Sequence, residues 1–311
     1  MSDVAPRGRR FARAGARGSL ESGIVTPSRI DLHTHSRASD GTDSPRGVLE
    51  AAAGAGLDVV ALTDHDTTAG WAEAADAVAP TGVALVRGTE ISTRVTTEGG
   101  SISVHLLSYL HDPDDVVLRA ECDRTRDDRL TRARRMTERL AEDFPLTWDD
   151  VVAQTGDDAT VGRPHLADAL VAAGVVATRD EAFATMLHPG ARYYVPHYAP
   201  DTDAAVRAVL GAGGVPVMAH PGAGARGRTV SDETIAALAA AGLAGLEVDH
   251  RDHDAATRDR LRGLAGELGL LVTGSSDYHG TGKLNRIGER VTAPEVLVQI
   301  EERGLLDVIR P

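Results

Sequence analysis

Short apolar runs alternate along this chain with Ala-rich stretches of helical periodicity, and this alternation restricts the fold more than any other feature. Apolar runs of about four to eight residues between turn signals are typical of buried strands. Strands and helices that alternate in this way predict a mostly parallel sheet with helices outside, an α/β fold. The predicted strands are 29–33, 58–63, 83–90, 101–109, 215–219, 245–248 and 270–275. The predicted helices between them are 44–55, 69–79, 231–241 and 255–268.

The alternation is interrupted between residues 111 and 200. Residues 114–143 form a long, strongly charged segment with helical periodicity, and two shorter helical segments follow at 163–173 and 179–187. One apolar seam of the long helix is predicted to consist of Leu130, Ala133, Met136 and Leu140. We therefore expect a helical insertion that packs over one face of a barrel. The predicted domains are a disordered basic leader at 1–28, a barrel made of 29–110 and 201–311, and a helical cap at 111–200.

The composition argues against several classes of partner. The net charge of −13 would repel the phosphate backbone of a long nucleic acid, so tight binding along one is not expected. Cys122 is the only cysteine, which excludes an intramolecular disulfide and favours the reducing cytoplasm. No apolar run is long enough to span a bilayer, so no membrane partner is expected. Lysine is nearly absent: of the 33 basic residues only Lys283 is a lysine, which fits a GC-rich genome.

Histidines and carboxylates gather at the ends of the predicted strands. Residues two apart on a strand point to the same side, so His33 and His35 can hold one ion together. A single histidine at a strand end is usually a polar rim residue, but six of the 12 histidines lie at such positions. Catalytic groups of barrel enzymes gather at the same strand ends. The candidate metal ligands are His33, His35, Asp40, His65, Glu90, His105, His220, Asp277 and His279.

The types of these side chains indicate the metal and the chemistry. Imidazole and carboxylate without thiolate suit Zn, Mn or Fe and argue against a structural zinc site built on cysteines. One ion takes about four to six ligands, so this set predicts more than one ion per chain. Such ions lower the pKa of a bound water and neutralise phosphate oxygens during in-line attack. The pattern therefore predicts a metal-dependent enzyme that hydrolyses phosphate esters.

Five motifs, in order along the chain, resemble the PHP (polymerase and histidinol phosphatase) family of the amidohydrolase superfamily. The motifs are His33-Thr-His35 with Asp40, Thr63-Asp-His65-Asp66, Gly88-Thr-Glu90, Ala219-His220-Pro221 and Ser276-Asp277-Tyr-His279. The resemblance runs from about Arg29 to Arg290. It is strongest to the bacterial subgroup of 3′,5′-nucleotide bisphosphate phosphatases and short-RNA exonucleases, which shares the Ser39-Asp40-Gly41 opening and a helical insertion. The family fold is a distorted (βα)7 TIM-like barrel, in agreement with the predicted strands.

The resemblance implies two to three metal ions per chain. Three positions follow when the motifs are carried over residue by residue. The first is held by His33, His35, Glu90 and Asp277; the second by Asp40, His65 and His279; the third by a bridging Glu90 with His105 and His220. Because no ligand is missing, a non-catalytic scaffold is disfavoured.

Two residues are expected to act in catalysis. Asp277 ends a predicted strand, where a carboxylate is positioned for metal and water. His253 stands where the relatives carry a histidine near the leaving group, although residues 250–252 replace an aromatic-proline pair found there in many relatives. Asp64 and Asp66 flank a candidate ligand and are interpreted as residues that orient ligands or cap a strand end.

The insertion offers groups that can contact a substrate. Arg163 and His165 open a predicted helix, where a guanidinium can clamp a phosphate through two hydrogen bonds. The matching stretch in the family reads Arg-x-His and faces the phosphates. An arginine at a helix start is also commonly solvated, and both interpretations stay open. Three arginines of the long helix, Arg129, Arg132 and Arg135, are interpreted mainly as a solvated face, and the alternative is that one of them reaches a second phosphate.

The expected activity is the hydrolysis of phosphate monoesters of nucleotides, either 3′,5′-bisphosphates or mononucleotides, by a metal-activated water. One alternative is a 5′-3′ exonuclease on short RNA or single-stranded DNA, which would share the metal site but require a basic, aromatic-lined groove. Tyr193 and Tyr194 are the one aromatic pair that could line such a groove. A histidinol-phosphate phosphatase is a further alternative. The expected partner is a small phosphorylated substrate, with a short oligonucleotide as the alternative.

Overall fold

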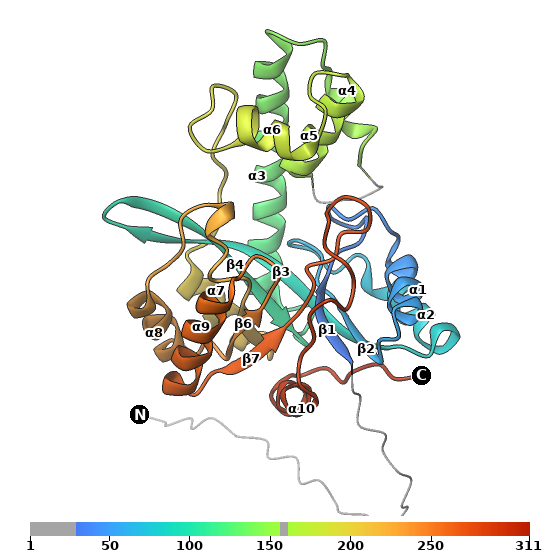
Figure 1. Ribbon diagram of the computed structural model, residues 1–311, viewed down its shortest axis with the longest axis vertical. Coiled ribbons are helices and arrows are strands. Elements are labelled where there is room, and N and C mark those ends of the chain that lie inside the picture. The colour runs from blue at the N-terminus through green and yellow to red at the C-terminus, as the bar shows by residue number, and fades with distance from the viewer. Residues whose placement is uncertain (1–28, 156–160) are drawn as a thin grey trace, which may run out of the picture.

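The computed structural model of the chain describes residues 29–155 and 161–311 (Figure 1), so the predicted leader at residues 1–28 lies outside the described residues. Within the described part, a sheet of seven strands has the order β1-β2-β3-β4-β5-β6-β7. An isolated parallel bridge between Thr34 and Tyr278 brings the two edges of the sheet together into a nearly closed barrel. The predicted α/β barrel fold is thereby confirmed. The strands are β1 (Ile30–Thr34), β2 (Val59–Leu62), β3 (Ala84–Thr97), β4 (Gly100–Tyr109), β5 (Val215–Met218), β6 (Gly245–Asp249) and β7 (Leu271–Gly274).

Helices cover the outside of the barrel (Figure 1). Two of them, α7 and α10, are not among the helices predicted from the sequence. The helix α10 lies at the lower end of the barrel in Figure 1 and brings Leu297 and Ile300 into the barrel core. The outer helices are α1 (Pro45–Gly54), α2 (Trp71–Thr81), α7 (Thr202–Gly211), α8 (Asp232–Ala240), α9 (Ala255–Leu268) and α10 (Pro294–Arg303), and a short 3-10 turn, η2 (Gly224–Arg226), precedes α8.

Alternate residues of the strands fill the barrel with apolar side chains. Ile30 and Leu32 of β1 are fully buried and pack in one cluster with side chains of the other strands, including Leu107 and Val217. Successive residues of a strand point to opposite sides, so this alternation sorts the inner from the outer face. The pairing of β1 with β2 is irregular between Asp31 and Thr34, and the buried polar residue His33 lies at this irregularity, directly after the apolar layer. The apolar filling below therefore supports a polar layer at the upper end of the barrel.

The strand β4 departs from the parallel pattern because it runs antiparallel to both β3 and β5. The pair β3–β4 is joined by a tight hairpin in which Thr97 pairs with Gly100, and a connection this short allows only antiparallel strands. Gly100 has a φ of 99°, a conformation that glycine adopts without strain. As a result His105 lies in the middle of β4, opposite Ser92, and not at the end of a strand as predicted. It still reaches the upper end of the barrel because β4 runs in the reverse direction.

Residues 116–187 form a helical layer above the barrel (Figure 1), with residues 156–160 outside the description. The long helix α3 connects the two layers. Its first half places Leu118 and Cys122 in a core cluster of the barrel, whereas Met136 and Leu140 belong to a separate core within the cap. Leu130 of the predicted seam is 37% exposed and belongs to neither cluster. The helices are α3 (Val116–Ala141), α4 (Trp148–Val152), α5 (Arg163–Ala172), α6 (Arg179–Ala182) and a π-helical turn, η1 (Phe183–Leu187).

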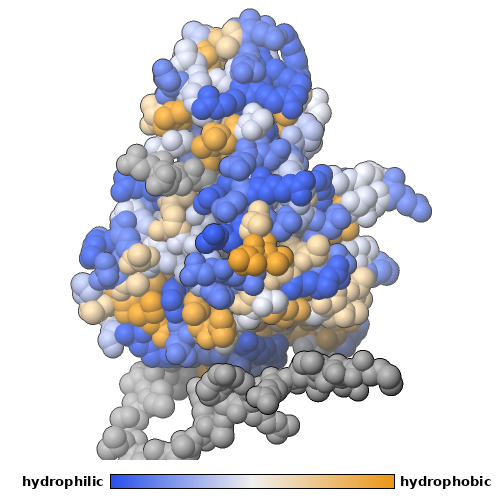
Figure 2. Space-filling view, turned by 180° about the vertical axis from the view of Figure 1, so that it is seen from behind, coloured by the Kyte–Doolittle hydropathy of each residue, from blue (hydrophilic) through white to orange (hydrophobic). Residues whose placement is uncertain are grey.

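The surface carries no continuous hydrophobic band on the face shown in Figure 2, where hydrophobic residues form separate patches between hydrophilic ones. The outer part of the β3–β4 hairpin projects from the body of the molecule in Figures 1 and 2. Among the helices described, none combines the length and the apolar character that crossing a membrane would require.

Candidate metal centre

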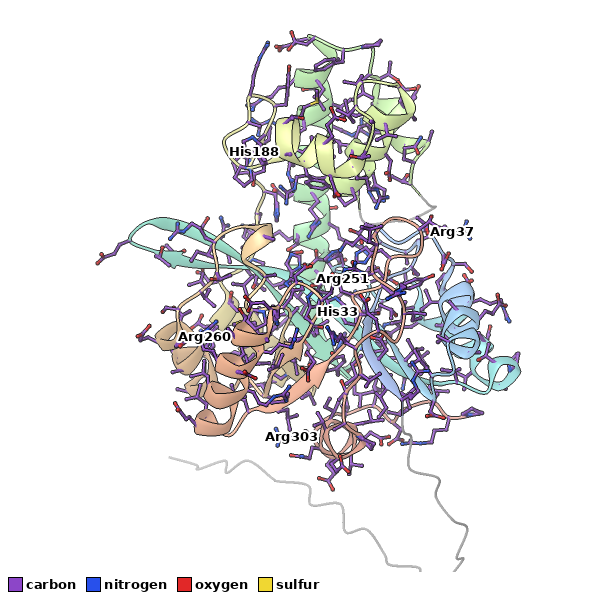
Figure 3. All side chains as sticks on the ribbon, viewed as in Figure 1. His33, Arg37, His188, Arg251, Arg260 and Arg303 are labelled. Carbon is purple, nitrogen blue, oxygen red and sulfur yellow. The ribbon has the colours of Figure 1, made fainter. Side chains whose placement is uncertain are left out.

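The predicted metal ligands meet at the upper end of the barrel, below the cap. His33, labelled in Figure 3, lies near the centre of the barrel in that view. Seven of the nine side chains are buried, and the other two, His105 and His220, are half-buried. They come from β1, β3 and β4 and from the loops that follow β1, β2, β5 and β7. Residues that are up to 246 positions apart in the sequence are thus collected into one cluster.

Three sets of donor atoms are compact enough to hold an ion, since within each set the atoms lie within 4.8 Å of one another. One set coincides with the first position that the family resemblance implies, and another contains the second position together with His35. His220 is not in the third set, although its Nε2 lies 3.1 Å from Glu90 Oε1. The sets are His33, His35, Glu90 and Asp277; His35, Asp40, His65 and His279; and His65, Glu90 and His105.

Glu90 occupies the middle of the cluster and divides its two carboxylate oxygens between histidines. Oε1 lies 2.8 Å from Nδ1 of His105 and 3.1 Å from Nε2 of His220. Oε2 lies 3.3, 3.1 and 3.1 Å from ring nitrogens of His33, His35 and His65. A carboxylate with donors gathered on each oxygen has the geometry of a bridging ligand between two ions.

The ligand atoms are placed to bind a cation and not to form hydrogen bonds with one another. Asp40 Oδ1 and His279 Nε2 are buried and lie 3.2 Å apart, yet neither forms a hydrogen bond within the described residues. An unsatisfied buried polar atom costs about 1–3 kcal/mol, more when the group is charged, so such pairs are rare without a function. A cation bound between the two atoms would satisfy both.

The charges of the cluster compensate one another in the absence of ions. Burial opposes ionisation of Glu90, but His105, His65 and His33 hold the pKa of that carboxyl well below its usual range. Burial likewise opposes protonation of His35, but Asp277, Glu90 and Asp40 raise its pKa to about 9. A metal must therefore displace a proton from His35, and metal binding should strengthen as the pH rises toward that value.

Two of the donors have a strained backbone. Among the described residues other than glycine, four have a positive φ, and they include His220 at 31° and Asp277 at 53°. A third, Asp66 at 54°, follows the ligand His65 directly. Such conformations cost on the order of 1–3 kcal/mol each and persist where the surroundings over-determine them. The folded barrel thus fixes the direction of these side chains.

A buried carboxylate that was not predicted, Glu247 on β6, orients two of the donors. Its Oε1 lies 2.9 Å from Nδ1 of His33, and its Oε2 accepts a hydrogen bond of 2.7 Å from the backbone N–H of His220. The Ser275 hydroxyl also donates to Glu247. A carboxylate on the far nitrogen of a histidine fixes the tautomer and turns the other nitrogen toward the metal. The signal in the sequence is a single glutamate between Leu246 and Val248.

Asp64 holds the loop that carries Asp40. Its Oδ1 accepts hydrogen bonds of 2.7 Å from the backbone N–H of Ser36 and from the Ser39 hydroxyl, and its Oδ2 accepts from the Ser36 hydroxyl. The interpretation that Asp64 orients ligands agrees with these contacts. Asp66 instead accepts from the backbone and hydroxyl of Ser92 on β3.

His253 does not face the cluster in the way that its predicted catalytic role requires. Its Nδ1 donates to the carbonyl of Val248 at 2.8 Å, and its Nε2 accepts from the backbone N–H of Gly222 at 3.0 Å. Both nitrogens are therefore engaged by the backbone. The neighbouring His250 is fully buried and lies closer to the donors, with its Nε2 3.7 Å from Asp277 Oδ2.

Of the two cap residues predicted to bind phosphate, His165 lies near the donor cluster. Its Nδ1 accepts a hydrogen bond from the backbone N–H of Gly162. Burial lowers the pKa of His165, and the charge of Asp40 offsets only part of this lowering. Arg163 donates to the carbonyl of Leu187 at 3.0 Å, so one part of its guanidinium is engaged within the cap. Its other contacts are with the rings of Phe183 and Tyr194.

Two arginines of α3 are buried, contrary to the solvated face predicted for them. Arg129 and Arg132 are 8% and 5% exposed, whereas Arg135 is exposed as predicted. Arg129 contacts both Asp66 and the hydroxyl of Ser92. The prediction fails because the cap covers a helix face that is charged, and a charged face carries no periodic signal for burial.

We expect protein saturated with Mn or Zn and then freed of loose ions to retain more than one ion per chain. The reason is that three compact donor sets share Glu90, His35 and His65, which one ion cannot satisfy together. Elemental analysis by plasma mass spectrometry against protein concentration measures the ratio. A ratio of one or below at saturation would contradict the multi-ion site.

Comparison with known proteins agrees with this geometry. Residues 31–143 match the PHP domain family. Over 286 residues the chain is 34% identical to a 3′,5′-nucleoside bisphosphate phosphatase of Chromobacterium violaceum, an alignment that covers 91% of this chain and 99% of the relative. It is 30% identical over 277 residues to a 5′-3′ exoribonuclease of Haemophilus influenzae, covering 88% of this chain and 98% of the relative.

A solved structure supports the same relationship. The chain is similar, with a TM-score of 0.86 and 46% sequence identity, to a protein of Bifidobacterium adolescentis described as a metal-dependent phosphoesterase. The similarity covers 90% of this chain and 98% of the solved one. It therefore includes the helical layer as well as the barrel.

Proposed function

The chain belongs to the PHP domain family and is a metal-dependent phosphoesterase, and we propose that it removes a phosphate from nucleotides that carry a second phosphate, with 3′,5′-bisphosphates as the preferred class. The relative from Chromobacterium violaceum is named for this activity. The proposal rests on one observation in this chain, a group of buried guanidinium groups beside the metal centre. A mononucleotide, with one phosphate, would use the metal centre alone.

Arg132 carries the argument because, within residues 29–155 and 161–311, no carboxylate forms an ion pair with its guanidinium. Its Nε and Nη2 are buried and form no hydrogen bond within the described residues. Burial, together with the charges of Arg163 and Arg129, lowers the pKa of Arg132 to about 9. A buried charge without a partner is costly, and removing that cost requires an anion. A phosphate is the anion that a guanidinium binds best, through paired hydrogen bonds.

The position of this arginine group relative to the metal centre fits a substrate with two phosphates. Arg129 contacts Asp66, which follows the ligand His65, and Ser92, which lies two residues beyond Glu90 on the same strand. The group therefore adjoins the donors on the side of β3. One phosphate would lie at the metal centre while the other meets Arg132.

We propose two to three divalent ions, Mn, Zn or Fe, for this centre. His33, His35, Asp40, His65, Glu90, His105, His220, Asp277 and His279 would hold them. When bound, the ions supply an activated water and neutralise the charge on the phosphate oxygens. The chain's own contribution is to orient these ligands through Glu247 and Asp64, and to exclude water by means of the cap.

We assign to His250 the contact with the leaving group that the sequence predicts for His253. Its Nδ1 accepts a hydrogen bond from the backbone N–H of Asp252, so in the neutral ring the proton sits on Nε2. That nitrogen points to the side of Asp277, at 3.7 Å from Oδ2. A donor at this atom can hydrogen-bond the oxygen from which the phosphate is cleaved.

The experiment that tests the proposal is a phosphate-release screen of the Mn-loaded protein. Its substrates are 3′,5′-bisphosphates, mononucleotides, histidinol phosphate and short oligonucleotides. We expect the highest kcat/KM for the bisphosphates because only they satisfy both the metal centre and Arg132. A higher value for mononucleotides or histidinol phosphate would contradict the proposed substrate class while leaving the phosphoesterase chemistry intact.

An exonuclease acting on short RNA or single-stranded DNA is the alternative, and one contact favours it. Tyr194 lies beneath two guanidinium groups, with its ring centre 5.6 Å from the guanidinium carbon of Arg132 and 5.8 Å from that of Arg163. An aromatic ring within a cationic site can stack on a base. Tyr193 is engaged elsewhere, since its hydroxyl donates to Asp143. Stepwise shortening of oligonucleotides in the same screen would identify this activity.

A further inference from the structure

The loop after His279 brings the chain's only lysine to the metal centre. Lys283 Nζ donates to Asp277 Oδ2 at 3.2 Å. The lysine side chain is 32% exposed, whereas that of Asp277 is 1% exposed. Lys283 is therefore in contact both with a predicted metal ligand and with the solvent from which a substrate arrives.

The two carboxylate oxygens of Asp277 have different partners. Oδ1 lies 3.5 Å from ring nitrogens of His33, His35 and His279, all members of the donor sets. Oδ2 points away from them, to Lys283 and to His250. Lys283 thus stands on the outer side of the carboxylate, and Oδ1 is left to the ions.

The backbone of this loop is held from four directions. Thr42 accepts from the N–H of Thr281 through its hydroxyl at 2.8 Å, and Asn285 donates to the carbonyl of Ser276 at 2.6 Å. Arg251 donates to the carbonyl of Leu284 at 2.6 Å. These contacts hold the backbone on both sides of Lys283, and none of them involves its side chain.

The fourth contact comes from the cap. Arg179 of α6 donates to the carbonyl of Gly282 at 2.9 Å, and its other nitrogens are bound by the carboxylate of Asp168 on α5. A Cβ at Gly282 would lie 2.5 Å from an Arg179 nitrogen, so a cap residue is in close contact with the residue before Lys283. The position of the lysine is therefore set where the cap meets the barrel.

The residue type is itself informative. Arginine occupies every other basic position of the chain, including all those that contact carboxylates elsewhere in the described residues. The chain's preference for arginine thus gives no reason for a lysine here. An ammonium is a compact charge on a flexible stem, and it can follow a ligand that a planar guanidinium cannot.

We propose that Lys283 binds an oxygen of the reacting phosphate at the metal centre, and that its contact with Asp277 is the position it takes without substrate. This inference rests on the proposed phosphoesterase function and adds a residue to it. A phosphate held beside Asp277 lies within the range of a side chain with four rotatable bonds. The arginine group of the cap then serves the second phosphate, and Lys283 serves the first from the side of β7.

Chemical labelling of Lys283 tests the contact without turnover. An amine-reactive ester can label only this side chain and the α-amino group, which serves as the internal reference within each sample. In the Mn-loaded protein we expect inorganic phosphate to slow labelling of Lys283 several-fold relative to the α-amino group, as measured by peptide mass spectrometry. We expect no such protection without Mn. Equal labelling with and without phosphate in the Mn-loaded protein would overturn the proposal.

Three variants supply the kinetic test on p-nitrophenyl phosphate, which has only the reacting phosphate. Lys283→Met should raise KM and the inhibition constant of inorganic phosphate roughly 5- to 20-fold, less than a fully buried charged hydrogen bond contributes because the ammonium is partly exposed. Lys283→Arg keeps the charge but not the compact ammonium, and it should recover only part of this loss. Arg286→Met, in the same loop, removes a charge whose side chain is 86% exposed and should change neither constant.

The outcomes separate this inference from the function on which it rests. Protection of Lys283 by phosphate in a protein that fails to hydrolyse nucleotides would overturn only the proposed substrate class. Hydrolysis of nucleotides with an unprotected lysine and an unaffected Lys283→Met would overturn only the role of Lys283. A Lys283→Met variant that loses bound Mn would show that the lysine acts through Asp277, which also contradicts phosphate binding.

Discussion

Replacing Asp277 by asparagine is expected to lower kcat/KM for every phosphate monoester about 10²- to 10⁴-fold, the range found when a group that handles the reacting water is removed. Asp277 is buried and contributes to a compact donor set with His33, His35 and Glu90. Asparagine keeps the shape of the side chain but removes its charge. It also tolerates the left-handed backbone at φ 53°, where alanine would add strain.

The measurement requires a control for folding and for charge. Circular dichroism and thermal unfolding of Asp277→Asn should show a largely intact fold, because the barrel core lies below the donor layer. Asp259→Asn removes an exposed carboxylate of α9 and should retain full activity. A folded Asp277→Asn variant with unchanged kcat/KM would remove Asp277 from the reaction and with it the proposed centre.

The strands were predictable because their signal is local, whereas their directions were not. Five strands (β1, β2, β5, β6 and β7) are runs of four or five mostly buried residues, whereas β3 continues to Thr97, beyond the predicted end at residue 90. The direction of β4 depends on the connection at Gly100, and the strand pattern does not encode which way a strand runs. Since β4 is reversed, His105 reaches the centre from the middle of the strand and not from its end.

The two helices that were missed carry only part of the local signal that marks a helix start: Asp201 precedes α7 and Pro294 opens α10. Ser44 caps α1 by accepting from the N–H of Gly47, and Pro45 follows it, so the start of this helix can be read from the sequence. Neither α7 nor α10 has a side-chain hydrogen bond at its N-cap. Their burial comes from packing on the barrel, which depends on residues far away in the sequence.

The donors at the metal centre were visible in the sequence because they end apolar runs or stand in short motifs. The groups that surround them were not, because tertiary packing brings them in. Arg132 is charged and lies on a helix with charges on several faces, so no pattern distinguishes it from the exposed Arg135. Glu247 and His250 stand close to His253 in the sequence, and only the folded β6 loop shows which of them reach the donors.

The buried guanidinium group leads to the second large effect. Arg132→Met is expected to lower kcat/KM for 3′,5′-bisphosphates about 10- to 150-fold, which corresponds to the roughly 1.5–3 kcal/mol of a charge-assisted hydrogen bond. Methionine retains an unbranched side chain that ends at about the position of the arginine Nε, and it removes the charge. On p-nitrophenyl phosphate, which has no second phosphate, the same variant should lose less than about threefold in kcat/KM.

The ratio between the two substrates decides the role of Arg132, and a matched variant guards against a general loss of charge. Arg135→Met changes an exposed arginine one turn further along α3 and should leave both values unchanged. The Arg132→Met protein should also be at least as stable as the wild type when no substrate is present, because an unpaired buried charge has been replaced by an apolar group. Equal losses on both substrates would instead place Arg132 at the reacting phosphate. If neither substrate were affected while stability rose, the buried charge would have no part in recognition, and the preference for bisphosphates would have to be assigned to Arg163 or abandoned.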